Sequence, residues 1–264
     1  MKKIISLIMA ILMIATLSLT LTSCSYKDDV RAVKEAGKLV VGITNYKPMD
    51  YLDEETGNWT GFDAELAKMF AEELGVNCQL VIIDWNNKVA ELNSKQIDLI
   101  WNGMTASDEL GEKIDFSVSY AKNAQVAVVK KNSSLTKDGI KNATIAVENG
   151  SAGENAARED IGATNLVEKS DGQVGALSEV LAGTADVAII DITMAQSVVG
   201  KGEYADLKIL EGASYGDEIF AVGLRKDSNL KAQLDAFLKA KYADGTITAL
   251  AEKYQVGINE DALK

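Results

Sequence analysis

Nine residues lie where predicted strands end or predicted helices begin, and their side chains could together bind a small molecule. In α/β proteins, loops at these places leave N–H groups and side chains free for a ligand. Aromatic rings can stack on a ligand or hold a cation, carboxylates can bind a cationic group, and a glycine permits close approach. The nine are Tyr46, Asp50, Trp85, Asn102, Gly103, Thr105, Glu148, Ser151 and Asp191.

Several of these residues also have a purely structural interpretation. Asp191 ends the apolar run Val187-Ala188-Ile189-Ile190, where an acid can face a ligand or cap a helix that starts at Ile192. Tyr46 and Trp85 could pack loops instead of contacting a ligand. Ser151 opens a predicted helix, whose free amides and dipole favour an anionic group. We favour ligand binding over the structural interpretation for Asp191, Tyr46 and Trp85.

Strand and helix patterns alternate along the chain, which is typical of parallel α/β layers. In the first helix, Asp63 can act as the N-cap and Gly75 ends the pattern. The predicted strands are 38–43, 80–83, 99–101, 126–129, 143–147, 187–190 and 219–224. The predicted helices are 63–74, 86–93, 172–181, 230–238 and 247–254. Because the pattern restarts after about residue 129, we expect two α/β lobes.

Composition excludes several classes of function. The chain has 264 residues, of which 47% are hydrophobic, enough for a sizeable core. It contains no histidine, so neither a Ser-His-Asp nor a Cys-His catalytic arrangement can form. The net charge of −12 repels phosphate backbones and anionic lipid surfaces, which argues against nucleic-acid partners.

The N-terminus has the features of an export signal. Lys2 and Lys3 precede an apolar stretch from Ile4 to Leu21. The stretch ends in Leu21-Thr22-Ser23-Cys24, which resembles a bacterial lipobox. The resemblance implies lipidation of Cys24 and an extracytoplasmic protein anchored in the bacterial membrane by acyl chains. The alternative is a signal-anchor helix, since the run is nearly long enough to span a bilayer.

Two further features invite a chemical role that the sequence does not support. With Cys24 lipidated, Cys78 is the one thiol left, and its alternation with apolar neighbours predicts a small core residue in a strand. The acidic segment 53–58 suggests calcium, but it lacks the spacing of an EF-hand loop and is better explained as a turn. We therefore predict neither a disulfide nor a metal site.

Three motifs, in this order and spacing, resemble the first lobe of the amino-acid-binding family of bacterial solute-binding proteins. They are Gly61-Phe62-Asp63-Ala64-Glu65-Leu66-Ala67, Ile83-Asp84-Trp85 and Ile97-Asp98-Leu99-Ile100-Trp101-Asn102-Gly103-Met104-Thr105. The resemblance extends over most of 38–257. It implies an α/β, two-lobed periplasmic-binding-protein type II fold with a ligand cleft between the lobes. It also implies a protein that captures a small solute outside the cytoplasmic membrane and delivers it to the permease of an ABC importer.

The resemblance also implies how the chain is divided. The chain is expected to cross between the lobes near 126–131 and 219–224, and the two crossings act as a hinge. The expected parts are a signal peptide at 1–24, a tether and lead-in at 25–37, a first lobe at 38–127 plus 222–264, and a second lobe at 128–221. We expect a monomer that needs no cofactor.

The family assigns roles to the candidate residues by position. The tyrosine matching Tyr46 stacks on the ligand, and the residue matching Trp85 forms the opposite wall; Asp50 stands where the family commonly has a glutamate. The positions of Asn102, Gly103 and Thr105 hydrogen-bond the ligand.

The second lobe contributes the other implied contacts. The aspartate matching Asp191 binds the ligand's α-ammonium group. Family members often have two hydroxyl residues where this chain has Ser151 and Ala152, and Glu148 occupies a cleft position that is often apolar in relatives.

One position departs from the family pattern. The family has Thr-x-Ser/Thr-x-x-Arg after Gly-Met, and its arginine clamps the ligand's α-carboxylate; this chain has Leu110 there. One hypothesis is an amine, or an amino acid whose carboxylate is masked, because burying an unpaired carboxylate is costly. The other is a polar amino acid whose carboxylate meets Lys113, Lys122 or the Ser151 helix end. We leave both open.

Two other functions on the same fold remain as alternatives. A binding protein can report to a signalling partner instead of a transporter. A dehydratase-like enzyme would need a general acid with a raised pKa among Asp50, Glu148 and Asp191. Nothing in the sequence selects one of these acids, and we favour a non-enzymatic binding protein.

Overall fold

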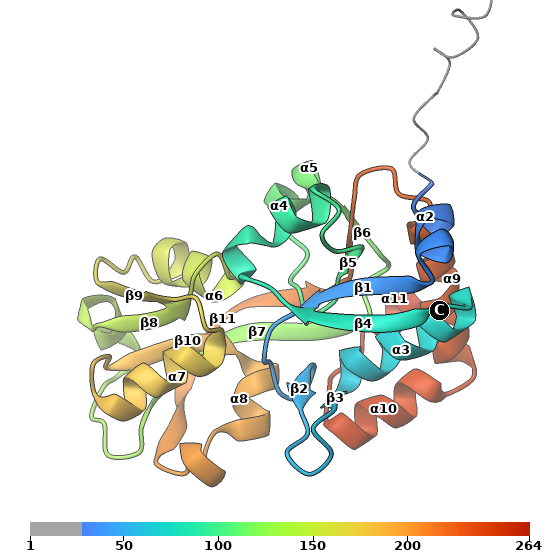
Figure 1. Ribbon diagram of the computed structural model, residues 1–264. Coiled ribbons are helices and arrows are strands. Elements are labelled where there is room, and N and C mark those ends of the chain that lie inside the picture. The colour runs from blue at the N-terminus through green and yellow to red at the C-terminus, as the bar shows by residue number, and fades with distance from the viewer. Residues whose placement is uncertain (1–27) are drawn as a thin grey trace, which may run out of the picture.

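Residues 28–264 are described by a computed structural model, in which two lobes are each built on a five-stranded sheet (Figure 1). The predicted signal peptide and Cys24 lie outside these described residues. The strands of the first sheet, in spatial order, are β4 (Asn77–Ile82), β1 (Lys38–Ile43), β5 (Leu99–Ile100), β12 (Gly223–Leu224) and β6 (Asp115–Phe116). β1 is parallel to β4 and β5, whereas β12 is antiparallel to its two neighbours.

The helices of the first lobe bury apolar faces against this sheet. In α3 the side chains of Leu66, Phe70 and Leu74 are buried, and Gly75 ends the helix in the left-handed conformation. The N-cap is Gly61, two residues before the predicted Asp63, and the Asp63 carboxylate is used elsewhere. The helices are α2 (Asp29–Ala36), α3 (Phe62–Leu74), α4 (Lys88–Asn93), α5 (Asp108–Lys113), α9 (Leu230–Ala243), α10 (Thr246–Tyr254) and α11 (Glu260–Leu263).

The second lobe repeats the α/β pattern with a different strand order. Its strands, in spatial order, are β11 (Leu207–Phe220), β7 (Ala121–Lys130), β10 (Val187–Asp191), β8 (Ile145–Glu148) and β9 (Leu166–Lys169). β8 is parallel to β10 and β9, and β7 is antiparallel to both of its neighbours. The α-helices of this lobe are α6 (Ala152–Asn155), α7 (Gln173–Ala182) and α8 (Ile192–Val198).

Short elements complete the chain. A hairpin of β2 (Tyr51–Leu52) and β3 (Trp59–Thr60) lies below the first sheet in Figure 1. Its turn is held by the Asp53 carboxylate, which accepts hydrogen bonds from the backbone N–H and the hydroxyl of Thr56. The remaining helical turns are η1 (Trp85–Asn87), η2 (Lys137–Asn142), η3 (Ala156–Asp160) and η4 (Gly202–Tyr204).

Two antiparallel strands, β7 and β11, carry the chain from one lobe to the other and back (Figure 1). The predicted strand 219–224 is divided in the structure, because β11 ends at Phe220 and β12 begins at Gly223. β11 is far longer than predicted. Gly212 and Gly216 have positive φ angles and the pairing with β7 shifts near them, so the strand has no regular alternation for a sequence to reveal.

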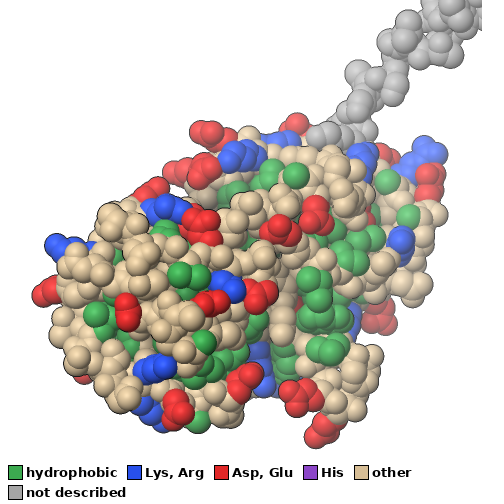
Figure 2. Space-filling model, turned by 60° about the vertical axis from the view of Figure 1, so that its left-hand side comes forward, with side chains coloured by type: hydrophobic (Ala, Val, Ile, Leu, Met, Phe, Trp, Pro, Cys, Tyr) green, Lys and Arg blue, Asp and Glu red, His purple; other side chains and the backbone are tan. Residues whose placement is uncertain are grey.

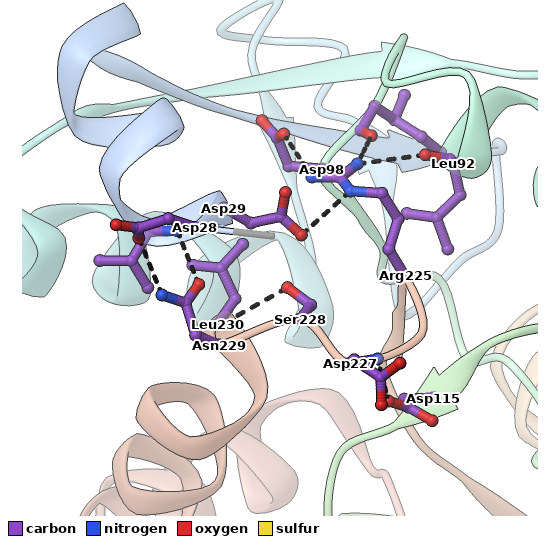
Figure 3. Close-up of polar contacts among 12 residues, drawn as sticks. Asp28, Asp29, Leu92, Asp98, Asp115, Arg225, Asp227, Ser228, Asn229 and Leu230 are labelled. Atoms are coloured by element: carbon purple, nitrogen blue, oxygen red, sulfur yellow. Dashed lines mark hydrogen bonds and ion pairs between the residues drawn. The ribbon is translucent and has the colours of Figure 1, made fainter. Parts of the chain in front are cut away.

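A buried arginine ties the start of the described chain to the rest of the first lobe (Figure 3). The Arg225 guanidinium forms ion pairs of 3.1 Å with both Asp29 and Asp98. It also donates to the carbonyl oxygens of Leu92 and Ile97, at 3.1 and 2.7 Å. One side chain thereby joins α2, the loop before β5 and the segment after β12.

Charged side chains of both signs lie on the surface (Figure 2). Figure 2 shows Lys and Arg side chains interspersed with Asp and Glu over one face of the molecule. Among residues 28–264, no helix has both the length and the apolar character needed to cross a membrane.

Candidate ligand-binding site

A cavity of about 270 Å³ lies between the lobes, and eight of the nine predicted ligand residues line it. The first lobe contributes the loops after β1 and β5 and the start of η1. The second lobe contributes the ends of β8 and β10 and the start of α6. The eight are Tyr46, Trp85, Asn102, Gly103, Thr105, Glu148, Ser151 and Asp191.

Asp50 is the predicted residue that the structure does not place on the cavity wall. Its side chain is completely buried, and its backbone pairs with that of Tyr46 in a tight turn. Burial, followed by the nearby charge of Asp63, raises the pKa of Asp50 well above its ordinary value. Asp50 therefore belongs to the interior that supports Tyr46.

The turn after β5 is held in place by side chains from two other segments. The Asn102 amide accepts a hydrogen bond from the backbone N–H of Thr44 at 2.9 Å and donates to the Thr44 hydroxyl at 2.8 Å. The Asp63 carboxylate accepts from the backbone N–H of Gly103 at 2.6 Å and from the Tyr120 hydroxyl at 2.8 Å. The spacing predicted Asp63 as a helix cap, but its carboxylate orients the cavity wall.

The two predicted aromatic residues form buried parts of the wall. Tyr46 meets the ring of Phe220 edge to face, with centroids 6.4 Å apart. It packs so closely on Gly103 that a Cβ there would lie 2.6 Å from Tyr46 Cε1. Trp85 opens η1, and the ammonium of Lys88 lies 4.8 Å from its ring centroid.

Asp191 is the most strongly organised acid of the cavity. Its Oδ1 accepts from the amides of Asn123 and Gln125, the latter at 2.6 Å, and its Oδ2 accepts from Gln173. Burial, and secondarily the charge of Glu218, raises the pKa of Asp191 to about 7, although the three amide contacts act in the opposite direction. The Asp191 side chain does not cap α8. Its carboxylate is thus buried, oriented by amides, and without an ion pair among residues 28–264.

A second acid, Glu218, shares the amides of Asn123 and Gln125 with Asp191 and links them to the first lobe. Glu218 Oε2 accepts from the Thr105 hydroxyl at 2.9 Å, from Asn123 at 2.8 Å and from Gln125 at 3.0 Å. The Thr105 hydroxyl therefore bonds to Glu218 on β11, one of the two crossing strands, and is not free in the cavity. Asn123 and Gln125 lie on β7, so this network joins the crossing strands to the cavity.

Buried polar atoms without partners face the cavity from the second lobe. Glu148 Oε1 and Gln125 Oε1 have no hydrogen-bond partner among the described residues, and both side chains line the cavity. Burial, then the charge of Asp191, raises the pKa of Glu148 to about 8. A ligand with N–H groups would satisfy these two oxygens.

Ser151 has a local structural role as well as a place on the wall. Its hydroxyl accepts from the backbone N–H of Glu154 at 3.1 Å and so caps α6. The Glu154 carboxylate in turn accepts from the N–H of Gly150 at 2.7 Å. Side chains of the protein therefore already accept from backbone N–H groups at the start of α6, where the sequence predicted an anionic group of the ligand.

Leu110, which stands at the family's arginine position, lines the cavity. The lysines near it differ in whether they could bind a carboxylate of the ligand. Lys113 lines the cavity but is half exposed and paired with Glu109 at 2.7 Å. Lys122 is exposed and does not line the cavity. The buried cation of the cavity is Lys88, which the sequence analysis did not single out.

No sequence pattern predicted the contacts of the amides that hold Asp191, or those of Glu218, which shares two of these amides. Gln125 and Gln173 line the cavity, and Asn123 and Glu218 complete the network. A local signal exists only for Gln173, which follows Gly172 at the start of a helix that faces the same cleft. Among the residues that the structure describes, no group of three or more Cys, Asp or Glu side chains could hold a metal ion.

The chain is similar to known proteins over most of its length. The family model of the bacterial extracellular solute-binding proteins, family 3, matches residues 39–257. The L-cystine-binding protein TcyJ of Escherichia coli (strain K12) is 31% identical over 254 residues, which cover 94% of this chain and 92% of TcyJ. The arginine-binding extracellular protein ArtP of Bacillus subtilis (strain 168) is 30% identical over 263 residues, covering 97% and 99%. The crystal structure of an ABC uptake transporter substrate binding protein from Streptococcus pneumoniae with bound histidine aligns with a TM-score of 0.78 at 29% identity, covering 87% and 97%.

Proposed function

Since the chain belongs to the bacterial extracellular solute-binding proteins, family 3, we propose that it is the binding lipoprotein of an ABC importer and captures a small solute with an amino group. The observation that carries the proposal is the Asp191 carboxylate, which is buried in the cavity, held by amides and without a cationic partner among the described residues. A ligand ammonium group would supply the opposite charge that this carboxylate lacks.

The other groups of the cavity fit such a ligand. The free Glu148 Oε1 and Gln125 Oε1 would accept from N–H groups of the ligand. Tyr46 and Trp85 would enclose it from the first lobe. Closure of the lobes over the solute would proceed by bending at β7 and β11. Two ligand classes satisfy this description: an amine or carboxylate-masked derivative, and a polar amino acid.

Delivery to a transporter is the role that the relatives favour. Two of the proteins described above are named for binding L-cystine or arginine, and the third is described as an ABC uptake transporter substrate binding protein with bound histidine. Cys24 would anchor the protein to the membrane through acyl chains; a radiolabelled fatty acid supplied to the cells should then label the wild type and not a Cys24→Ser variant. A sensing role is the alternative, and genes for a permease and an ATPase beside the gene of this protein would support transport.

An enzyme on the same fold is a less favoured alternative. The raised pKa values of Glu148 and Asp191 are what a general acid needs. The same values follow from burial beside like charges in a site that binds a cation, and the relatives described above are binding proteins. We therefore propose binding and not catalysis.

Thermal unfolding of the purified protein against a panel of amino acids, amines and derivatives tests this function. A ligand at 100 times its Kd should add about 2.7 kcal/mol to the free energy of unfolding, which raises Tm by about 5–10 °C. The shift should disappear in Asp191→Ala and persist in Asp217→Ala, an exposed acid on β11 outside the cavity. An unchanged shift in Asp191→Ala would refute the assignment of the site.

A further inference from the structure

A single lysine of the first lobe contacts the backbone of both lobes at the cavity. Lys88 is the first residue of α4 and is 5% exposed. Its Nζ donates to the carbonyl oxygen of Trp85 in its own lobe at 3.1 Å and to that of Gly150 in the second lobe at 2.8 Å. Unlike the bond between Thr105 and Glu218, this link between the lobes does not involve β7 or β11.

The bonds that Lys88 makes do not neutralise it. An ammonium group has three donors, and the two acceptors here are uncharged carbonyl oxygens. Among the described residues, no carboxylate forms an ion pair with Lys88. Burial lowers the pKa of Lys88 to about 8, and the charge of Glu148 opposes this decrease. A buried cation with a free donor in a binding cavity favours an anionic group that the protein does not provide.

The surroundings of Lys88 show where that anion would lie. Leu110 lines the same cavity and offers no charge, and Lys113 is already paired with Glu109. The carboxyl groups of Asp191 and Glu148 lie on the wall formed by the second lobe. The cavity therefore presents acids for an ammonium group and, on the wall formed by α4, a cation for an acidic group.

We propose that Lys88 binds the carboxylate of the ligand and thereby makes the site selective for an amino acid over the corresponding amine. This inference rests on the function proposed above, because it assigns one end of a ligand whose other end is at Asp191. The third N–H of Lys88 donates to the carboxylate, and its bond to Gly150 places that contact under the closed second lobe. Carboxylate recognition and lobe closure then depend on the same ammonium group.

Matched pairs of an amino acid and its decarboxylated amine test the inference. The probes are L-arginine with agmatine, L-histidine with histamine, and L-cystine with cystamine, measured by isothermal titration calorimetry on the purified protein. We expect the wild type to prefer the amino acid of the bound pair by at least tenfold. In Lys88→Met, the affinity for the amino acid should fall to about that for the amine, while the affinity for the amine changes little.

Two variants separate recognition from a merely structural role. Lys34→Met is the control, because Lys34 is exposed on α2 and does not line the cavity; it should keep the preference. Lys88→Arg should retain it, since a guanidinium also donates to a carboxylate. Equal losses for both members of a pair in Lys88→Met would mean that Lys88 only joins the lobes, and would overturn the inference.

The remaining outcomes distinguish this inference from the proposed function. Amine binding as tight as amino-acid binding in the wild type would overturn the role of Lys88 and leave the proposed function standing. A preference for the amino acid that survives in Lys88→Met would also overturn the role of Lys88 and leave the proposed function standing. Absence of binding by every probe, and by the wider panel of amino acids and amines, would count against the proposed function and the inference together.

Discussion

The carboxylate of Asp63 accepts a 2.6 Å hydrogen bond from the backbone N–H of Gly103, so a completely buried acid in α3 positions the turn that lines the ligand cavity. The same oxygen accepts from the Tyr120 hydroxyl at 2.8 Å. Burial raises the pKa of Asp63 to about 7, while the bonds from Gly103 and Tyr120 oppose this increase. The geometry of the cavity therefore depends on an interior contact between segments 40 residues apart.

Removal of this acid should damage both stability and binding. Asp63→Ala leaves the N–H of Gly103 and the hydroxyl of Tyr120 buried without an acceptor, at a cost of about 1–3 kcal/mol for each group. We expect the free energy of unfolding to fall by about 2–6 kcal/mol in urea denaturation, with weaker ligand binding in the folded protein. Asp261→Ala, whose side chain is 88% exposed, should change stability by less than about 0.5 kcal/mol. A loss below about 1 kcal/mol in Asp63→Ala would contradict this expectation.

A side chain at Gly103 should disturb the cavity more than one at another left-handed glycine. Gly103 has φ +54°, and a Cβ there would lie 2.6 Å from Tyr46 Cε1. Gly37 has φ +66°, but a Cβ there would meet no other atom within 4 Å. Gly37→Ala should therefore cost only the backbone strain of about 1–2 kcal/mol, whereas Gly103→Ala adds about 1–3 kcal/mol of overpacking.

The two glycine variants should also differ in ligand affinity. Gly103→Ala displaces Tyr46, so we expect at least a tenfold increase in Kd by calorimetry. Gly37→Ala lies at the end of α2, away from the cavity, and should bind as the wild type does. Equal affinity of the two variants would show that Tyr46 does not contact the ligand.

Ligand binding should release protons near neutral pH. The pKa values of Asp191 and Glu148 are raised from ordinary values of 3.8 and 4.5 to about 7 and about 8. The free protein therefore retains protons on these groups at about pH 5.5 to 7.5, and an ammonium group favours the ionised forms. Affinity for a cationic group should rise with pH over this window, by up to about tenfold per pH unit for each coupled proton.

The sign of the same shifts also predicts the pH dependence of stability. Between about pH 4 and 8 the folded, ligand-free protein binds more protons at Asp191 and Glu148 than the unfolded chain does. Its stability should therefore decrease as pH rises through this range, because both groups lose their extra protons.

Calorimetry in buffers of different ionisation enthalpy measures the number of protons released on ligand binding, and Glu148→Gln should reduce that number. Affinity that falls from about pH 5.5 to 7.5 would be the opposite of this expectation.

Truncation of Arg225 should be among the most destabilising changes in the first lobe. Arg225→Ala leaves the buried carboxylate of Asp29 and that of Asp98 without their cation (Figure 3). Breaking such a buried pair costs about 3–5 kcal/mol, measurable by urea denaturation. In the control Arg31→Ala, the lost pair with Glu35 is exposed, and the change should be about 0.5 kcal/mol or less. Similar effects of the two substitutions would argue against a structural role for Arg225.

The cavity shows which kinds of residue a sequence can reveal. Tyr46, Trp85, Asn102, Gly103 and Asp191 could be predicted because each follows a strand or opens a helical turn, and the ends of parallel strands meet at one edge of a sheet. Motif spacing reinforced the same positions.

The residues that were missed or misplaced depend on packing between distant segments. Asp63 has the spacing of a helix cap, yet its carboxylate meets a turn that lies far along the chain. Lys88 has the pattern of a surface residue on a short helix, yet it is buried and donates to Gly150 of the other lobe. Glu218 lies in a strand that two glycines make irregular, so no periodicity pointed to it.

The sequence by itself determined the alternation of strands and helices and the restart of that pattern that indicates two lobes, because these follow from local hydrophobic periodicity and turn residues. The cleft between the lobes was implied by the resemblance to the family. It also determined that no histidine chemistry is possible and that Leu110 stands at the family's arginine position. Only the tertiary structure decided the charge state and partners of the cavity groups. Burial and the distance between charges set a pKa, and both depend on how segments remote in sequence, such as β10 and β11, come together.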